Sequence, residues 1–169
     1  DENIFCVLPI NSKNFFKNQL VTIKLDLQRR KDISKMHSAI HLFCSLNSDK
    51  MIRGYAGNIK SKIEFEGNFE YFKNNFDKIK SKFLNFVELK KNINKYLINY
   101  TYAKKMIELE EFNSNLKGMV RVVEIDGLNP RVCFGTHVQN TSEISDIFIS
   151  KPEKTGDLKY KVNLNLKND

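Results

Sequence analysis

The three histidines of this 169-residue chain fall within two short motifs, each of which places two potential metal ligands four residues apart. The motifs are His37-Ser38-Ala39-Ile40-His41 and Cys133-Phe134-Gly135-Thr136-His137. Two histidines at positions i and i+4 of a helix project from one face, with about 5–6 Å between Cβ atoms, so both imidazoles can hold one cation. Zinc accepts imidazole nitrogen and thiolate sulfur, usually as four ligands in a tetrahedron. The spacing therefore predicts that His37, His41, Cys133 and His137 bind Zn²⁺.

The residues alone do not decide whether such a site is structural or catalytic. Either all four side chains bind the ion, or one detaches and leaves a position for water or substrate, as catalytic zinc sites require. A lone helical histidine pair is more often engaged in ordinary hydrogen bonds, but the second motif supplies the remaining histidine and a cysteine at the same spacing, which favours a metal site. An H-E-x-x-H protease motif is excluded, because Ser38 stands where the glutamate general base would be. Cys44, three residues past His41, is expected to be a core residue.

The flanks of both motifs resemble a known family. The segments concerned read L-D-L-Q-R-R at 25–30, M-H-S-A-I-H-L at 36–42 and C-F-G-T-H-V-Q-N-T-S-E-I at 133–144. They are similar to the I-D-W-x-R-R, M-x-x-H-T-A-x-H-L-L and C-G-G-T-H-V-x-x-T-G-E-I-G stretches of the editing domain of alanyl-tRNA synthetase and of the free-standing alanyl-tRNA trans-editing proteins. The resemblance spans residues 20–166. The editing domain of threonyl-tRNA synthetase is a more distant relative, and Thr136 favours the alanyl branch.

This resemblance implies a zinc-dependent aminoacyl-tRNA deacylase, either a trans-editing factor or an editing domain, that removes serine or glycine from alanine tRNA. Such an activity has a physical reason, because a binding pocket separates alanine from a smaller or hydroxylated side chain by only about 1–3 kcal/mol. The four ligands would also be the catalytic residues. Residues expected to contact the substrate are Ser38, Tyr55, Ala56, Asn58 and Thr136, of which Ser38, Thr136 or the metal could bind the serine hydroxyl.

The chain departs from the family pattern at three glycines, where it carries Phe134, Ser142 and Ser145. Glycine is required where φ is positive or where a backbone passes close to a ligand, so Phe134 is expected to narrow or reshape the pocket. Two other readings therefore stay open. One is a catalytically impaired tRNA-binding accessory domain of the same fold, and the other is a small structural zinc domain without an RNA partner.

Composition agrees with a tRNA partner bound at its acceptor end. The net charge is +8 and the sequence pI is near 9.3, which suits a polyanion. A group of lysines could contact phosphate or could simply form a solvated face: Lys78, Lys80, Lys82, Lys90, Lys91 and Lys95. No apolar run approaches the roughly 18–20 residues that span a bilayer, and the first residues lack the basic start of a signal peptide. The odd number of cysteines indicates a reducing compartment, so a cytoplasmic location is expected.

Hydrophobic periodicity predicts an α+β fold, an antiparallel sheet with helices packed on one side. We expect short strands at 3–10 and 20–26, a helix from Leu27 or Arg29 to Leu46, strands at 51–55 and 59–65, and a long helix after the Asn68 cap. Relatives carry a small β-barrel before the editing domain. Residues 1–28 are therefore interpreted as a possible remnant of that barrel, in a reduced protein or a fragment of a longer one, and residues 29–169 as the editing-like domain.

The last part of the chain is expected to be mostly β. The predicted elements are a strand at 97–102, a helix at 103–112, and strands at 119–125, 144–150 and 158–166, the last two joined by a turn at 152–156. In the long helix, phenylalanines recur at three- and four-residue steps from Phe69 to Phe86, which is typical of core packing.

Overall fold

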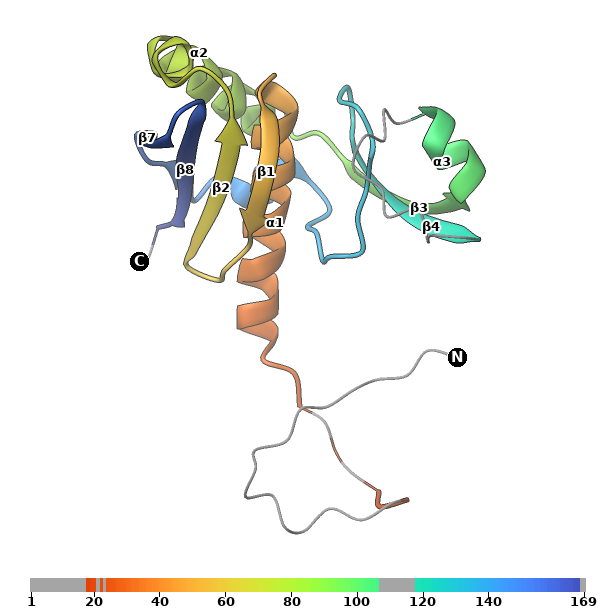
Figure 1. The fold of residues 1–169 in the computed structure, drawn as a ribbon. Coiled ribbons are helices and arrows are strands. Elements are labelled where there is room, and N and C mark those ends of the chain that lie inside the picture. The colour runs from red at the N-terminus through yellow and green to blue at the C-terminus, as the bar shows by residue number, and fades with distance from the viewer. Residues whose placement is uncertain (1–17, 21, 23, 107–117, 168–169) are drawn as a thin grey trace.

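The computed structural model describes residues 18–20, 22, 24–106 and 118–167. Within these residues the chain forms two antiparallel sheets and the helices that accompany them (Figure 1). The predicted α+β class is therefore confirmed, although the prediction had one sheet where the structure has two. None of the helices formed by the described residues combines the length and hydropathy that a membrane crossing requires.

The larger sheet has the strand order β1-β2-β8-β6, in which every pairing is antiparallel. Its strands are β1 (Lys50–Tyr55), β2 (Lys60–Glu66), β6 (Ile147–Ile149), β7 (Glu153–Gly156) and β8 (Lys159–Leu166), with β7 paired to β8 beside β6. In β2 the residues Ser61, Ile63 and Phe65 are buried, as the alternating pattern predicts. The strand begins one residue later than expected, and Ile59 stays 52% exposed.

Helix α1 (Leu27–Leu46) has the predicted bounds. Its N-cap is Asp26, whose Oδ1 accepts a hydrogen bond from the backbone N–H of Arg29 at 2.9 Å. Met36, Ile40 and Phe43 are buried on one side of the helix, because they recur at three- and four-residue steps. This apolar stripe packs on the large sheet and fixes the rotation of α1 about its axis.

Helix α2 (Phe69–Glu88) is capped by Asn68, as predicted, and its phenylalanine stripe is confirmed as core packing. Phe72 and Tyr160 of β8 stack with ring centroids 4.3 Å apart, and Phe65 stacks on the same tyrosine at 5.3 Å. Phe76 and Phe83 are also buried. Burying an aromatic side chain of this size contributes about 1.5–3 kcal/mol, so these rings join α2 firmly to the sheet.

The smaller sheet has the order β3-β4-β5, formed by β3 (Ile93–Asn99), β4 (Met119–Ile125) and β5 (Arg131–Val132). Figure 1 shows β3 and β4 beside the larger sheet, with α3 (Tyr100–Met106) against them. The strand at 119–125 has the predicted bounds. Residues 133–140 return from β5 towards α1, and they lead into the short 3-10 helix η1 (Thr141–Ile144).

Four predicted elements are wrong in position. The strand expected at 97–102 ends at Asn99, whose side chain accepts from the N–H of Thr101 and starts α3 instead. The strand expected at 144–150 is shorter, because β6 spans Ile147–Ile149 and Ile144 is the last residue of η1, which a capping box between Asn140 and Glu143 stabilises. The turn expected at 152–156 is strand β7, and the chain turns at 157–158, where Leu158 has φ 52°.

The fourth error lies before α1. Residues 20, 22 and 24–26 of the expected strand 20–26 are described, and they lie outside any strand, with Leu20 98% and Leu25 62% exposed. The alternation of apolar and polar residues in this stretch is typical of a strand, but the positions that are described pair with no strand within the described residues. The expected strand 3–10 and the end of the helix expected at 103–112 lie outside the described residues. The division into residues 1–28 and 29–169 stays a prediction.

Candidate metal centre

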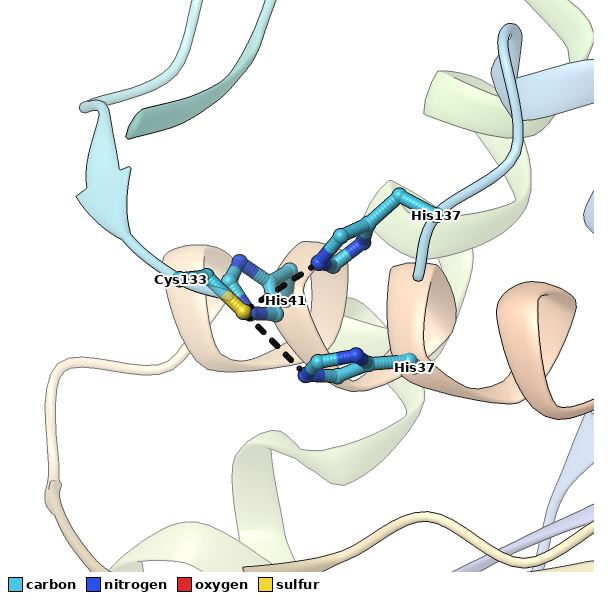
Figure 2. A group of neighbouring side chains, drawn as sticks. All are labelled: His37, His41, Cys133 and His137. Carbon is cyan, nitrogen blue, oxygen red and sulfur yellow. Dashed lines mark hydrogen bonds between the residues drawn. The ribbon is translucent and has the colours of Figure 1, made fainter. Parts of the chain in front are cut away.

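Four side chains that the sequence singled out converge on one point (Figure 2). One ligand atom from each of His37, His41, Cys133 and His137 lies within 4.8 Å of the other three. The Sγ of Cys133 is 3.5 Å from Nε2 of His37 and 3.3 Å from Nε2 of His137. The three imidazole rings have centroids 4.2–4.9 Å apart. These four residues are called the ligand set below.

The donor chemistry and spacing of the ligand set fit zinc. With Zn–N near 2.0–2.1 Å and Zn–S near 2.3 Å, neighbouring donors of a tetrahedral site lie about 3.4–3.6 Å apart. The two sulfur–nitrogen distances, 3.5 and 3.3 Å, match that separation. His37 and His41 come from one turn of α1, and Cys133 and His137 from the segment after β5. The two motifs thus supply two donors each.

Ser38 lies between His37 and His41 in the sequence and is buried. Its hydroxyl joins α1 to the segment that carries His137. Its Oγ donates to the carbonyl of Ser34 at 2.9 Å, lies 3.1 Å from Nδ1 of His137, and accepts from the N–H of Val138 at 3.1 Å. The side chain has no exposed surface. The hydroxyl is therefore engaged by the protein on every side, and it positions His137.

Two cations from the smaller sheet hold the segment 133–139 in place. Arg121 of β4 donates through Nη1 to the carbonyls of Gly135 at 2.6 Å and Cys133 at 3.4 Å. Lys95 of β3 donates through Nζ to the carbonyls of Val138 at 3.0 Å and His137 at 3.4 Å. Charge-assisted hydrogen bonds are stronger than neutral ones, so these contacts fix the backbone that carries two of the ligands.

Sequence reasoning missed both cations. It placed Lys95 in a group of lysines that either contact phosphate or face solvent, whereas the side chain of Lys95 binds backbone carbonyls beside the ligand set. Arg121 was not singled out. In the sequence it is the polar member of an alternating strand pattern between Val120 and Val122, which by itself does not distinguish a supporting cation from a solvent-facing one.

The polar run after His137 has a structural role. Thr141 Oγ1 donates to the carbonyl of Phe86 at 2.7 Å and accepts from the N–H of Lys91 at 2.9 Å. The carboxylate of Glu143 accepts from the N–H groups of Gln139 and Asn140. The bonds of Thr141 attach the segment to the end of α2, and those of Glu143 hold the backbone directly after Val138, so the chain is fixed on both sides of His137.

The glycine that the site needs is Gly135. A Cβ at this position would lie 2.1 Å from Cε1 and 2.4 Å from Nδ1 of His37, which is far closer than any real contact. Phe134, in contrast, is 62% exposed. The expectation that Phe134 narrows the pocket is not supported, because its side chain points largely into solvent. Ser145 has φ −65°, and none of Phe134, Ser142 and Ser145 is among the described residues with positive φ.

Burial keeps the histidines of the ligand set neutral. It lowers the pKa of His37, and it lowers the pKa of His41 further, aided by repulsion from the neighbouring imidazoles and Arg131. Burial, with repulsion from His37, Arg121 and Lys95, lowers the pKa of His137 to about 3. Burial raises the pKa of the Cys133 thiol, although Arg121 opposes this. Neutral imidazole is the form that binds metal, so three of the four donors are ready at neutral pH.

The residues expected to contact substrate fall into separate places. Tyr55, 66% exposed, ends β1, and Ala56 and Asn58 lie in the turn to β2. Ser38 is buried beneath His137. Thr136 is half-buried, and a hydrogen bond joins its backbone to the ring of His37. Of these five residues, Thr136 is the one that also lines a cleft beside the ligand set.

That cleft is open and has a volume of about 260 Å³. It lies between the N-terminal turns of α1 and Thr136, and its lining residues are Asp26, Arg29, Arg30, Ile33 and Thr136. Figure 1 shows these turns of α1 extending beyond the edge of the large sheet. Ile33 is one helical turn before His37, and Thr136 directly precedes His137. The cleft therefore adjoins the ligand set.

The chain has relatives among known proteins. Residues 120–160, which include Cys133 and His137, match the family described as the threonyl and alanyl tRNA synthetase second additional domain. An alanine–tRNA ligase from Campylobacter jejuni strain RM1221 is 32% identical over 148 residues, which cover 79% of this chain and 16% of the ligase. The ligase from Mycoplasmopsis synoviae strain 53 is 28% identical over 155 residues, with 86% and 18% covered.

A shorter relative matches as well. The alanyl-tRNA editing protein AlaX-M of Methanosarcina barkeri strain Fusaro is 28% identical over 142 residues, which cover 78% of this chain and 57% of the editing protein. The chain thus spans 16–18% of the length of the two ligases and little more than half of the editing protein. The resemblance predicted from the two motifs and their flanks, to editing domains and to free-standing editing proteins, is confirmed.

Proposed function

The chain is a homologue of alanyl-tRNA synthetases and of an alanyl-tRNA editing protein, with the second additional domain of that superfamily at residues 120–160, and we propose that it edits mischarged alanine tRNA by zinc-dependent hydrolysis. The substrate would be the ester that joins serine or glycine to the terminal ribose. The acceptor end of tRNA is then the partner, and the cytoplasm, where aminoacyl-tRNA is used, is the proposed location.

The observation that carries this proposal is the convergence of four donor atoms within 4.8 Å, next to an open cleft. His37, His41, Cys133 and His137 would hold the ion. When bound at such a site, zinc supplies Lewis acidity, which polarises a carbonyl and acidifies water. Ser38, Arg121 and Lys95 keep the donors in place, as their hydrogen bonds to His137 and to the carbonyls of residues 133–138 indicate.

Selectivity for serine over alanine is assigned to Thr136. The Ser38 hydroxyl is fully engaged by protein groups, whereas Thr136 lines the cleft beside His137. A hydroxyl that bonds the serine side chain would lose that partner with alanine bound, and leaving a polar group unpaired costs about 1–3 kcal/mol. The correct product would therefore be spared. Thr136→Val should reduce the ratio of serine to alanine removal while Thr136→Ser retains it.

The test combines metal analysis with deacylation of Ser-, Gly- and Ala-charged alanine tRNA. The proposal expects about one zinc per chain, hydrolysis of the Ser or Gly ester, and a largely intact Ala ester. His37→Ala and Cys133→Ala should lose zinc and hydrolysis together. Cys44→Ala is the matched control, because it removes a buried thiol that lies outside the ligand set.

Two results would contradict the proposal. Full deacylation by metal-free protein would exclude the role of zinc. A chain that retards tRNA on a gel without speeding loss of any ester would be a tRNA-binding accessory domain of the same fold instead of an enzyme.

A further inference from the structure

The cleft beside the ligand set carries two arginines that the ligand chemistry does not use. Arg29 and Arg30 lie in the first turn of α1, are both exposed, and line the cleft with Thr136 on the opposite side. Neither forms a salt bridge with any other described residue. The carboxylate in the cleft, Asp26, accepts the N–H of Arg29 through Oδ1 as the N-cap of α1, so the two arginines outnumber it. Two exposed arginines therefore line an open cleft that adjoins the ligand set.

We propose that Arg29 and Arg30 bind the phosphate group nearest to the aminoacylated ribose and so place the ester at the ligand set. This rests on the proposed function. In an aminoacyl-tRNA the ester and the 5′-phosphate belong to the same terminal nucleotide, on opposite sides of one ribose. A phosphate site must therefore lie close to the ligand set, and this cleft adjoins the ligand set at Ile33 and Thr136. The two arginines are positioning residues, because they do not touch the reacting atoms.

The shape and chemistry of the cleft fit this occupant. Its volume of about 260 Å³ is below the range of about 300–1,000 Å³ typical of sites that enclose a whole drug-sized ligand. It suits a phosphate with part of its sugar. The planar guanidinium of arginine pairs with phosphate oxygens in a bidentate manner, which lysine cannot do. Ile33 provides an apolar wall on the side of α1 that leads to His37.

The test uses two esters that differ only in the phosphate: the seryl ester of adenosine and the seryl ester of adenosine 5′-monophosphate, with Ser-tRNA as the full substrate. Losing a charge-assisted contact to phosphate corresponds to about a 10- to 100-fold effect. Arg29→Ala and Arg30→Ala should each raise KM by about that factor for Ser-tRNA and for the phosphorylated ester, with kcat nearly unchanged. For the adenosine ester they should behave as the unaltered chain does.

Lys31→Ala is the matched control, since Lys31 is an exposed cation in the same turn that does not line the cleft. Arg29→Lys and Arg30→Lys should recover only part of the loss. Equal effects of the alanine variants on both small esters, or no effect on Ser-tRNA, would overturn the phosphate site. Hydrolysis of none of the three substrates by the unaltered chain would overturn the proposed function instead.

If the unaltered chain hydrolyses none of the three substrates, the phosphate site can still be tested by measuring the binding of uncharged tRNA. The slope of log affinity against log salt concentration should fall by about one for each arginine removed, because one phosphate contact and its counterions are lost. The slope for Lys31→Ala should stay unchanged. Arginine variants with an unaltered slope would show that the cleft holds no tRNA phosphate.

Discussion

The hydroxyl of Ser38 lies 3.1 Å from Nδ1 of His137, and it assigns the tautomer of that ring. The single hydroxyl proton of Ser38 goes to the carbonyl of Ser34, so Oγ can only accept from His137. The neutral ring therefore carries its proton on Nδ1, and Nε2 presents a lone pair towards Cys133. The hydrogen bond from His137 to Ser38 thus leaves Nε2 of His137 unprotonated, which is the form of this nitrogen that a metal would bind.

Ser38→Ala should weaken zinc binding by about 10- to 100-fold, the usual effect of removing a group that orients a histidine ligand. It also leaves the N–H of Val138 without its partner, which costs about 1–3 kcal/mol of stability. Competition with a chromophoric chelator measures the affinity. Ser38→Thr keeps the hydroxyl and should restore most of it. An alanine variant with undiminished zinc affinity would contradict the assigned tautomer.

Gly135→Ala should remove zinc binding, because the new methyl group would overlap the ring of His37. Two controls separate this effect from a general loss of fold. Phe134→Gly, at the exposed neighbouring position, should leave the zinc content unchanged. Gly156→Ala meets only ordinary contacts at 3.8 Å and beyond, so it should also be neutral. Zinc retained by Gly135→Ala would show that His37 does not occupy the position described.

Zinc binding at pH 7.5 should release about one proton per ion. Burial raises the pKa of Cys133 above its usual 9.0, so the metal-free site holds a thiol, while the histidines are already neutral. Zinc requires the thiolate. Calorimetry in buffers of different ionisation enthalpy counts the protons. Cys133→Ala, at whatever affinity remains, should release almost none. Release of two or more protons by the unaltered chain would place charged histidines in the metal-free site.

The metal-free chain should lose stability as the pH falls below 6.5, the ordinary pKa of histidine. Burial lowers the histidine pKa values in the folded state, so below pH 6.5 the unfolded chain binds protons that the folded chain does not. Each histidine then contributes a slope of up to about 1.4 kcal/mol per pH unit. Urea unfolding at pH 7 and pH 5 measures this. His137→Ala should show a smaller slope, and equal slopes would contradict the burial of its ring.

Much of the site could be predicted from the sequence because its signals are local. His37 and His41 share a helix face, and the apolar stripe of Met36, Ile40 and Phe43 fixes both the helix and the side that it turns to the sheet. The convergence with Cys133 and His137 followed from chemistry, since no other histidines exist to complete a shell.

The supporting cations could not be predicted in the same way. Lys95 lies 42 residues from His137, and its contact depends on the pairing of β3 with β4. The errors in secondary structure have a similar cause. Strand β7 contains Gly156 and follows Pro152, which are turn-forming residues, but pairing with β8 and the ion pair of Glu153 with Lys161 hold it extended. Long-range contacts overrode local propensity at these positions.

The two pairs of ligands belong to different halves of the molecule. His37 and His41 are fixed to the five-stranded sheet through α1, and Cys133 and His137 follow β5 of the three-stranded sheet and are held by its cations. An ion bound by all four would cross-link these halves as a disulfide cross-links two segments. The two sheets would then move less relative to each other with the ion bound than without it. By the same coupling, any change that separates the sheets would weaken the binding of the ion.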